Sequence, residues 1–137
     1  MDTITVVGSG VMGKGIAYTC AVSGYRVYLN DINNNILSKA KDDIFSLLEG
    51  SFQKGFLSEE QYKSAKENLF FEADLKAAAK DAHLVIEAVL EKIELKIDIF
   101  KKLDSICTPE TILATNTSTM SPTEIGAQTS RPDKVVA

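Results

Sequence analysis

The sequence predicts an α/β fold built on a doubly wound, mainly parallel β-sheet. Three observations lead to this prediction: short and almost wholly apolar segments recur along the chain, helical patterns separate them, and a glycine-rich turn directly follows the first segment. Apolar strands that alternate with helices are typical of parallel sheets covered by helices on both faces. The 137 residues, of which 45% are hydrophobic and 25% charged, have the size and composition of one globular domain.

The first three elements form a βαβ unit. Residues 3–8 are β-branched and apolar, as in a strand buried on both faces, and residues 26–31 form a second strand. Between them, residues 11–24 predict a helix rich in small side chains, and Gly24 stands where helices commonly end. The unit takes about 30 residues, which is enough for a crossover between parallel strands.

A helical hairpin is expected after the second strand. Residues 33–49 predict one helix, and a capping-box pattern opens a second helix over residues 59–68. The next strand, residues 69–73, begins about 40 residues after Asp31. One crossover helix does not need that length, so we expect the two helices to project from the sheet. The apolar stripe of the first helix would consist of Ile36, Ala40, Ile44 and Leu47 or Leu48.

The second half of the chain continues the alternation of strands and helices. The helix over residues 91–106 should bury an apolar stripe and turn a lysine-rich face to solvent. The other expected elements are a short helix from Asp74, strands over residues 82–89 and 111–115, a short helix over 121–128 and the start of a sixth strand within 133–137.

The glycine-rich turn has the pattern G-x-G-x-x-G and carries the clearest chemistry. It consists of Gly8, Ser9, Gly10, Val11, Met12 and Gly13. After a buried strand and before a helix, the first glycine makes the tight turn, the second lets the backbone approach a pyrophosphate, and the third lets helix and strand pack closely. The phosphates would lie at the positive end of the helix.

Asp31 ends the second strand, 18 residues after Gly13, close to where an acidic residue binds the adenine ribose of a dinucleotide. A carboxylate at this position repels the 2′-phosphate of NADP. The sequence therefore predicts NAD as the cofactor.

Other polar residues leave alternatives open. Glu87 interrupts an apolar strand near the edge that faces ligands in this fold, where a polar role is favoured over simple exposure at the strand end. Glu91 and Lys96, taken as bare sequence, fit a solvated helix face better than a site. The hydroxyl and amide side chains of residues 115–119 fit either turn chemistry or a site that binds a substrate oxygen.

Some kinds of site and partner are not expected. The net charge of −4 argues against a nucleic-acid partner, and no apolar segment approaches the ~18 residues of a membrane helix. Cys20 and Cys107 fit two buried free thiols in a reducing cytoplasm, and we expect no metal site. His83 is the one histidine. Because it stands at the beginning of its strand, at the bottom of the sheet, it should lie at the surface, away from the ligand edge.

Several of these segments together resemble a family. The glycine turn, Asp31, "LVIEAVLEKIELK" (84–96), "ETILATNTSTMS" (110–121) and "RPDKVVA" (131–137) are similar to the NAD-binding domain of L-3-hydroxyacyl-CoA dehydrogenases, and most similar to the bacterial 3-hydroxybutyryl-CoA dehydrogenases. The resemblance implies a Rossmann-type fold and a reaction that interconverts an L-3-hydroxyacyl-CoA and a 3-ketoacyl-CoA.

The resemblance also implies roles for individual residues. Those expected to bind NAD are Gly8, Ser9, Gly10, Val11, Met12, Gly13, Asp31, Glu91, Lys96, Asn116 and Ser118. Ser118 would also hydrogen-bond the 3-oxygen of the substrate as the catalytic residue of this chain. Lys54 and, less closely matched, Ser46 would contact the CoA tail along the hairpin.

The family's general-base histidine, which stands in a His-Phe-x-Asn-Pro motif, and its paired glutamate have no counterpart in residues 1–137. We therefore expect these residues to be a truncated NAD-binding domain that is inactive alone. A helical C-terminal domain would complete the substrate site and form a homodimer or higher oligomer. The alternatives are a non-catalytic NAD-binding module and a hydroxy-acid or sugar dehydrogenase of the same superfamily.

Overall fold

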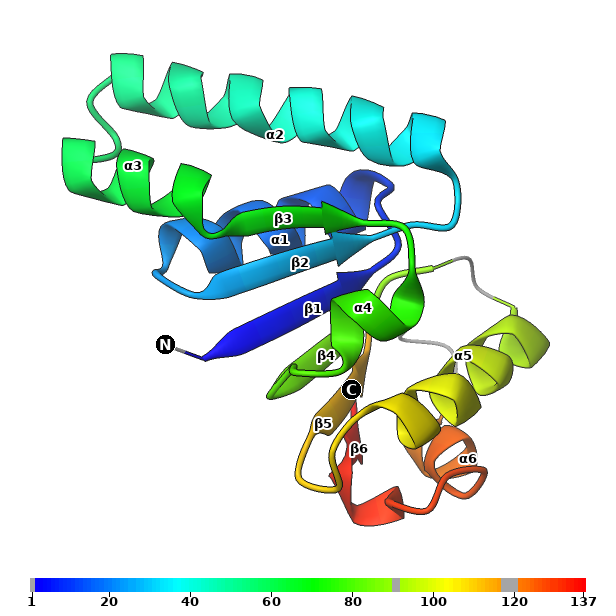
Figure 1. Ribbon diagram of the computed structural model, residues 1–137. Helices are drawn as coiled ribbons and strands as arrows, with labels where there is room; N and C mark the ends of the chain where they lie inside the picture. The colour runs from blue at the N-terminus through cyan, green and yellow to red at the C-terminus, as the bar shows by residue number, and fades with distance from the viewer. Residues whose placement is uncertain (1, 90–91, 117–120) are drawn as a thin grey trace.

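The sheet is parallel and has its strand order reversed at the centre. A computed structural model describes residues 2–89, 92–116 and 121–137. Within these ranges, six strands pair in the order β3-β2-β1-β4-β5-β6, and every pairing is parallel (Figure 1). The chain passes outward from β1 to β2 and β3, and then returns to β4 on the other side of β1. The predicted doubly wound, Rossmann-type fold is confirmed.

The elements follow the predicted order, with ends that differ by a few residues. The strands are β1 (Thr3–Val7), β2 (Arg26–Asn30), β3 (Leu69–Glu72), β4 (Leu84–Glu87), β5 (Ile112–Thr115) and β6 (Val135–Val136). The helices are α1 (Val11–Val22), α2 (Asn34–Gln53), α3 (Glu59–Glu67), α4 (Leu75–Ala79), α5 (Ile93–Ile106), α6 (Pro122–Gly126) and the 3-10 turn η1 (Pro132–Lys134).

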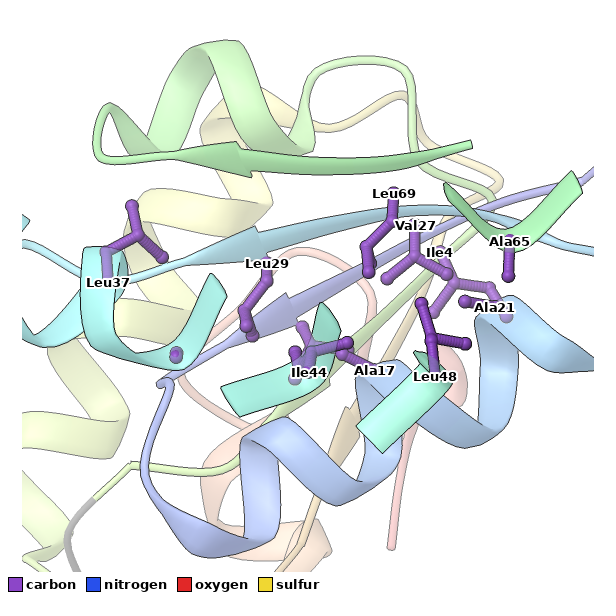
Figure 2. Close-up of a cluster of buried hydrophobic side chains, with 12 residues drawn as sticks. Ile4, Ala17, Ala21, Val27, Leu29, Leu37, Ile44, Leu48, Ala65 and Leu69 are labelled. Atoms are coloured by element: carbon purple, nitrogen blue, oxygen red, sulfur yellow. The ribbon is translucent and has the colours of Figure 1, made fainter. Parts of the chain in front are cut away.

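Helices cover the sheet on both faces, and each face has its own core. The cluster under α1, α2 and α3 includes Val6, Val27 and Leu29 from the first two strands (Figure 2). The cluster under α4, α5 and α6 includes Val85 and Leu113 from the later strands. Because successive residues of a strand point to opposite faces, these two sets come from alternate positions of nearly continuous apolar segments.

The helical hairpin is made by α2 and α3, as predicted, although α2 runs four residues further than expected, to Gln53. Ile36 was wrongly placed in the predicted stripe, since it is 47% exposed, and of the two leucines offered Leu48 is buried whereas Leu47 is 50% exposed. The side chains that pack inward are Leu37, Ala40, Ile44 and Leu48. Their spacing of three, four and four residues follows one helix face, whereas Ile36 and Leu47 lie beside it.

Capping fixes where the hairpin helices begin. The side chain of Asn33 accepts hydrogen bonds from two backbone N–H groups at the start of α2. Ser58 and Gln61 form the predicted capping box at the start of α3. The helix α2 begins beside the carboxyl end of β2 and runs back along the sheet, so the hairpin tip lies at the opposite end of the strands (Figure 1).

Candidate functional site

The glycine turn lies where β1 meets β4 and the strand order reverses. Gly8 has φ of 102°, and a Cβ atom added to it would lie 2.6 Å from the carbonyl oxygen of Ala88. A Cβ on Gly13 would lie 1.8 Å from the carbonyl oxygen of Gly8. The first and third glycines are therefore required by the protein's own packing, one for the turn and one for the close contact of α1 with the end of β1.

Gly10 has a different environment. A Cβ at this position would meet no described atom within 4 Å, so the space beside the turn at Gly10 is open. Gly10 is also the N-cap of α1, and within the described residues no side chain caps the first turn of this helix. Uncapped backbone N–H groups beside open space suit an anion at the positive end of the helix dipole. The turn thus fits a pyrophosphate.

Asp31 lies beside this turn, at the end of β2. Its Oδ2 accepts hydrogen bonds from the backbone nitrogen and the hydroxyl of Ser9, at 3.1 and 2.8 Å, and its Oδ1 accepts one from the backbone nitrogen of Asn33 at 3.0 Å. These donors hold the carboxylate beside the glycine turn, at the carboxyl end of β2, where doubly wound sheets form the crevice that binds ligands. The motif alone did not indicate the contact with the Ser9 hydroxyl, because any residue is allowed at that position.

This placement leads to a prediction about cofactor choice. We expect NADH to bind more tightly than NADPH by more than about tenfold, or about 1.4 kcal/mol, because a 2′-phosphate would lie beside the Asp31 carboxylate. Titration of both nucleotides into the chain measures the ratio. In Asp31→Asn the ratio should shrink, whereas in Asp2→Asn, a control at an exposed aspartate, it should not. Equal affinities in the unmodified chain would contradict the role given to Asp31.

Glu87, at the end of β4, is fully buried and fully hydrogen-bonded. Its Oε2 accepts from the ammonium group of Lys96 at 2.6 Å and from the backbone nitrogen of Val89 at 2.7 Å. Its Oε1 accepts from the hydroxyl of Thr115 at 2.6 Å. The three donors come from α5, from the segment before α5 and from β5. The Glu87 carboxylate is thus buried and paired. The prediction of a polar role, rather than simple exposure at the end of the strand, is confirmed.

The interpretation of Lys96 as part of a solvated helix face was wrong. Both Lys96 and Glu87 have side chains that are 0% exposed, and their ion pair lies within the core under α5. A signal for this was present in the sequence. Lys96 lies on the same helix face as the buried Phe100 and Leu103, where an amphipathic helix should carry apolar residues.

The remaining predicted site residues lie in different places. Asn116 is exposed just after β5, and its backbone nitrogen donates to the carbonyl oxygen of Glu87 at 2.8 Å. Glu91 and Ser118 lie outside the described residues. Ser46 and Lys54 are both exposed on the hairpin, and Lys54 is the C-cap of α2. The structure therefore brings together the glycine turn, Asp31 and the ends of β4 and β5, with Lys54 remote from them.

His83 lies at the opposite end of the strands from the crevice. It directly precedes β4, it is exposed, and its Nδ1 accepts a hydrogen bond from the backbone nitrogen of Thr3 at 3.0 Å. Cys20 and Cys107 are free thiols, and Cys107 is the more buried of the two. Burial raises the pKa of the Cys107 thiol to about 11. At neutral pH this thiol is therefore protonated and weakly nucleophilic.

Within residues 2–89, 92–116 and 121–137, no group of three or more His, Cys, Asp and Glu side chains is arranged to hold a metal ion. No helix in these ranges combines the length and apolar character needed to cross a membrane.

Comparison with known proteins gives consistent matches over nearly the whole chain. Residues 3–137 match the family described as "3-hydroxyacyl-CoA dehydrogenase, NAD binding domain". The chain is 39% identical over 135 residues to the 3-hydroxyadipyl-CoA dehydrogenase of Escherichia coli strain K12, a match that covers 98% of this chain and 28% of that protein. It is also 39% identical over 133 residues to the probable 3-hydroxybutyryl-CoA dehydrogenase of Bacillus subtilis strain 168, covering 97% and 46%.

Comparison of the fold with solved structures also gives a match over nearly the whole chain. The crystal structure of 3-hydroxybutyryl-CoA dehydrogenase from Escherichia coli K12 superposes with a TM-score of 0.93 at 40% identity, and the match covers 99% of this chain and 28% of that one. The chain spans less than half the length of each of these three relatives.

Proposed function

Because the chain belongs to the 3-hydroxyacyl-CoA dehydrogenase family, as its NAD-binding domain, we propose that the protein containing it interconverts an L-3-hydroxyacyl-CoA and the corresponding 3-ketoacyl-CoA. The cofactor is NAD. Short-chain substrates of the 3-hydroxybutyryl-CoA type are favoured, since two of the relatives carry that name. The assignment corresponds to a step of fatty acid or butanoate metabolism.

The observation that carries this proposal is the convergence of four polar features on the carboxyl ends of β1, β2, β4 and β5. The glycine turn faces open space at Gly10, Asp31 lies beside Ser9, and Glu87 with Asn116 lies on the far side of β1. In doubly wound sheets a dinucleotide binds at this edge, at the reversal of strand order. Asp31 would hold the adenine ribose, and the turn from Gly8 to Gly13 would hold the pyrophosphate.

The rest of the site follows the family resemblance. When bound, NAD would supply the hydride acceptor for C3 of the hydroxyacyl group. Ser118 would then hydrogen-bond the 3-oxygen on which charge develops, and Glu91, Lys96 and Asn116 would support the nicotinamide half of the cofactor. We infer that the general base belongs to a helical C-terminal domain, that this domain forms a homodimer or higher oligomer, and that the enzyme is cytoplasmic.

Cofactor binding and turnover by this chain test the proposal. We expect the 137 residues to bind NADH but not to reduce acetoacetyl-CoA at an ordinary enzyme rate. General-base help is typically worth ~10²–10⁴-fold, and the one imidazole, that of His83, lies at the wrong end of its strand. Calorimetric titration and an NADH absorbance assay measure the two outcomes. Absence of NADH binding would refute the proposal. Turnover that His83→Ala abolishes would show that this histidine is the base.

Lys54 provides a test of the acyl-CoA part of the proposal. Lys54 is the exposed C-cap of α2, and this end of the helix lies away from the carboxyl ends of the strands (Figure 1). We therefore expect it to contact the nucleotide end of a CoA whose thioester lies at the crevice. In an active protein that contains this chain, Lys54→Glu should raise KM for acyl-CoA with little change in NADH binding, because an attractive contact with phosphate becomes repulsive. The effect should weaken at high salt.

The matched control for Lys54→Glu is Lys80→Glu, an equal charge reversal at the exposed C-cap of α4 on the other face of the sheet. It should leave KM unchanged. A short pantetheine thioester lacks the nucleotide phosphates, so its KM should not respond to Lys54→Glu. An equal rise for this thioester would assign the lysine a different role.

A further inference from the structure

The turn that ends α2 at the tip of the hairpin has a fixed backbone. Gly55 has φ of 78°, and its nitrogen donates to the carbonyl oxygen of Phe52 at 3.0 Å. The nitrogen of Phe56 donates to the carbonyl oxygen of Ser51 at 2.9 Å. With Lys54 as the C-cap, these two bonds make a Schellman motif, in which Phe56 is the second residue past the cap. The hydrogen bonds of the turn therefore fix where Phe56 leaves the helix.

The side chain of Phe56 has no apolar surface to pack on at the helix end. In a Schellman motif, an apolar residue at this position usually contacts the third or fourth residue back from the cap. Those residues are Ser51 and Gly50. The hydroxyl of Ser51 is hydrogen-bonded to that of Tyr18 at 2.8 Å, and a Cβ on Gly50 would meet no described atom within 4 Å. The Phe56 ring accordingly remains 75% exposed.

The turn does not depend on this ring for its own anchoring. The next residue, Leu57, packs against the buried cluster under α1, α2 and α3 and so supplies the apolar contact of the tip. Exposure of one apolar side chain is common on proteins and is not by itself evidence of a site. Phe56 stands out because its backbone is fixed, the helix side next to it is bare, and a cation lies beside it in the turn.

That cation is Lys54, which is exposed and separated from Phe56 by one residue. An aromatic face binds a planar base by stacking, and a lysine ammonium binds phosphate. Together they suit a nucleotide that carries a phosphate group close to its base. The tip lies at the end of the sheet away from the crevice (Figure 1), where the proposed function places the nucleotide end of CoA, an adenosine with phosphate groups.

We propose that the ring of Phe56 stacks on the adenine of the acyl-CoA substrate while Lys54 contacts a phosphate group of the same nucleotide. Phe56 is thus a further residue that determines affinity for CoA esters. This inference rests on the proposed function and adds a contact to which neither the sequence motifs nor the family resemblance assigns a role.

Substitutions at Phe56 test the stacking in an active protein that contains this chain. Phe56→Ala should raise KM for acetoacetyl-CoA by about five- to tenfold, the lower end of what one base–aromatic stack contributes, because only one face of the adenine is covered. The kcat should stay within about twofold, since the contact is remote from the reacting carbon. Phe56→Leu, which keeps an apolar side chain without a ring, should raise KM like alanine. Phe56→Trp should keep KM within about twofold or lower it.

Two controls separate stacking from other effects. A pantetheine thioester lacks the adenine, so its KM should be the same for all of these variants. The matched substitution is Phe70→Leu on β3, where the ring stacks on Tyr28 at 5.0 Å. Because Leu69 and Phe71 pack under the hairpin, Phe70 points to the opposite face of the sheet, and its substitution should leave KM unchanged. Thermal unfolding should show that the Phe56 variants are as stable as the unmodified protein.

Three results would overturn the inference. Unchanged KM for acetoacetyl-CoA in Phe56→Ala would show that the ring has no contact with the substrate. Retention of KM in Phe56→Leu would show an apolar contact without stacking. An equal rise of KM for the pantetheine thioester would place the contact away from the nucleotide. In all three cases the unmodified protein still reduces acetoacetyl-CoA, so the proposed function stands. An unmodified protein that does not reduce it would refute the proposed function, and this inference with it.

Discussion

Replacing Gly13 by alanine should disable the domain, although alanine is the residue most favourable to a helix. The added Cβ would lie 1.8 Å from the carbonyl oxygen of Gly8 and 2.8 Å from its carbonyl carbon, and both are backbone atoms that cannot rotate away. Either α1 moves off the end of β1 or the glycine turn changes shape. Overpacking of this kind typically costs ~1–3 kcal/mol and occasionally more. We expect the free energy of unfolding to fall by an amount near the upper end of this range. NADH affinity should fall by more than about tenfold.

Gly15→Ala is the matched control, because it makes the same change two residues further along the same helix. A Cβ there meets no described atom within 4 Å. It should be neutral or should stabilise the domain by about 0.5–1 kcal/mol, because alanine restricts the unfolded chain more than glycine. Chemical denaturation and NADH titration of both variants measure the difference. If Gly13→Ala behaved like Gly15→Ala, the close contact of α1 with the glycine turn would be refuted.

Replacing Arg131 by methionine should cost about 3–5 kcal/mol of unfolding free energy, the range for breaking a buried ion pair. Arg131 is only 6% exposed, and its Nε donates to Oδ1 of Asp104 at 2.7 Å. Its two terminal nitrogens donate to the backbone carbonyl oxygens of Asp104, Cys107, Thr108 and Thr111. Methionine fills the stem and leaves these acceptors without their donor. Arg26→Met, at an exposed arginine, is the control and should change stability little.

The cost of losing Arg131 should depend on pH. Burial acts to raise the pKa of Asp104, but hydrogen bonds from Ser130 and Arg131 outweigh it and hold this pKa below its ordinary value. A carboxyl group with a lowered pKa in the folded state stabilises that state above its unfolded pKa and loses this contribution as pH falls through the folded pKa. The difference in stability between the unmodified chain and Arg131→Met should therefore shrink in acid. A difference that grows in acid would contradict this assignment.

The fold could be predicted largely because its signals are local. Each strand is a short apolar segment, each crossover is a helix, and the caps at Asn33 and Ser58 use side chains that bond to nearby backbone. The predicted stripe of α2 was partly wrong because Ile36 and Leu47 are as apolar as the leucines beside them. Packing against α1, α3 and β3 selects Leu37 and Leu48 as the buried positions.

The candidate site was harder to predict because its contacts join distant segments. The roles of Gly8 and Gly13 followed from a motif with a known mechanism, and the structure shows the close contacts that it implies. The environment of Lys96 could not be predicted in the same way. Periodicity indicates which face of a helix is buried, but it does not indicate that a buried carboxylate on another element pairs with a residue of that face. Thr115 likewise gains its role only from the pairing of β4 with β5.

The attachment of the helical hairpin has a consequence for how sequences of this kind can vary in length. The hairpin leaves the sheet at β2 and returns at β3, which are neighbouring parallel strands, and its tip lies at the end of the sheet away from the crevice (Figure 1). Residues gained or lost at the tip, between Gln53 and Ser58, change neither the order of the strands nor the position of the glycine turn. Lengthening a surface loop costs little loop-closure entropy. We therefore expect the length of the hairpin to vary between related sequences while the dinucleotide site at the other end of the strands stays the same.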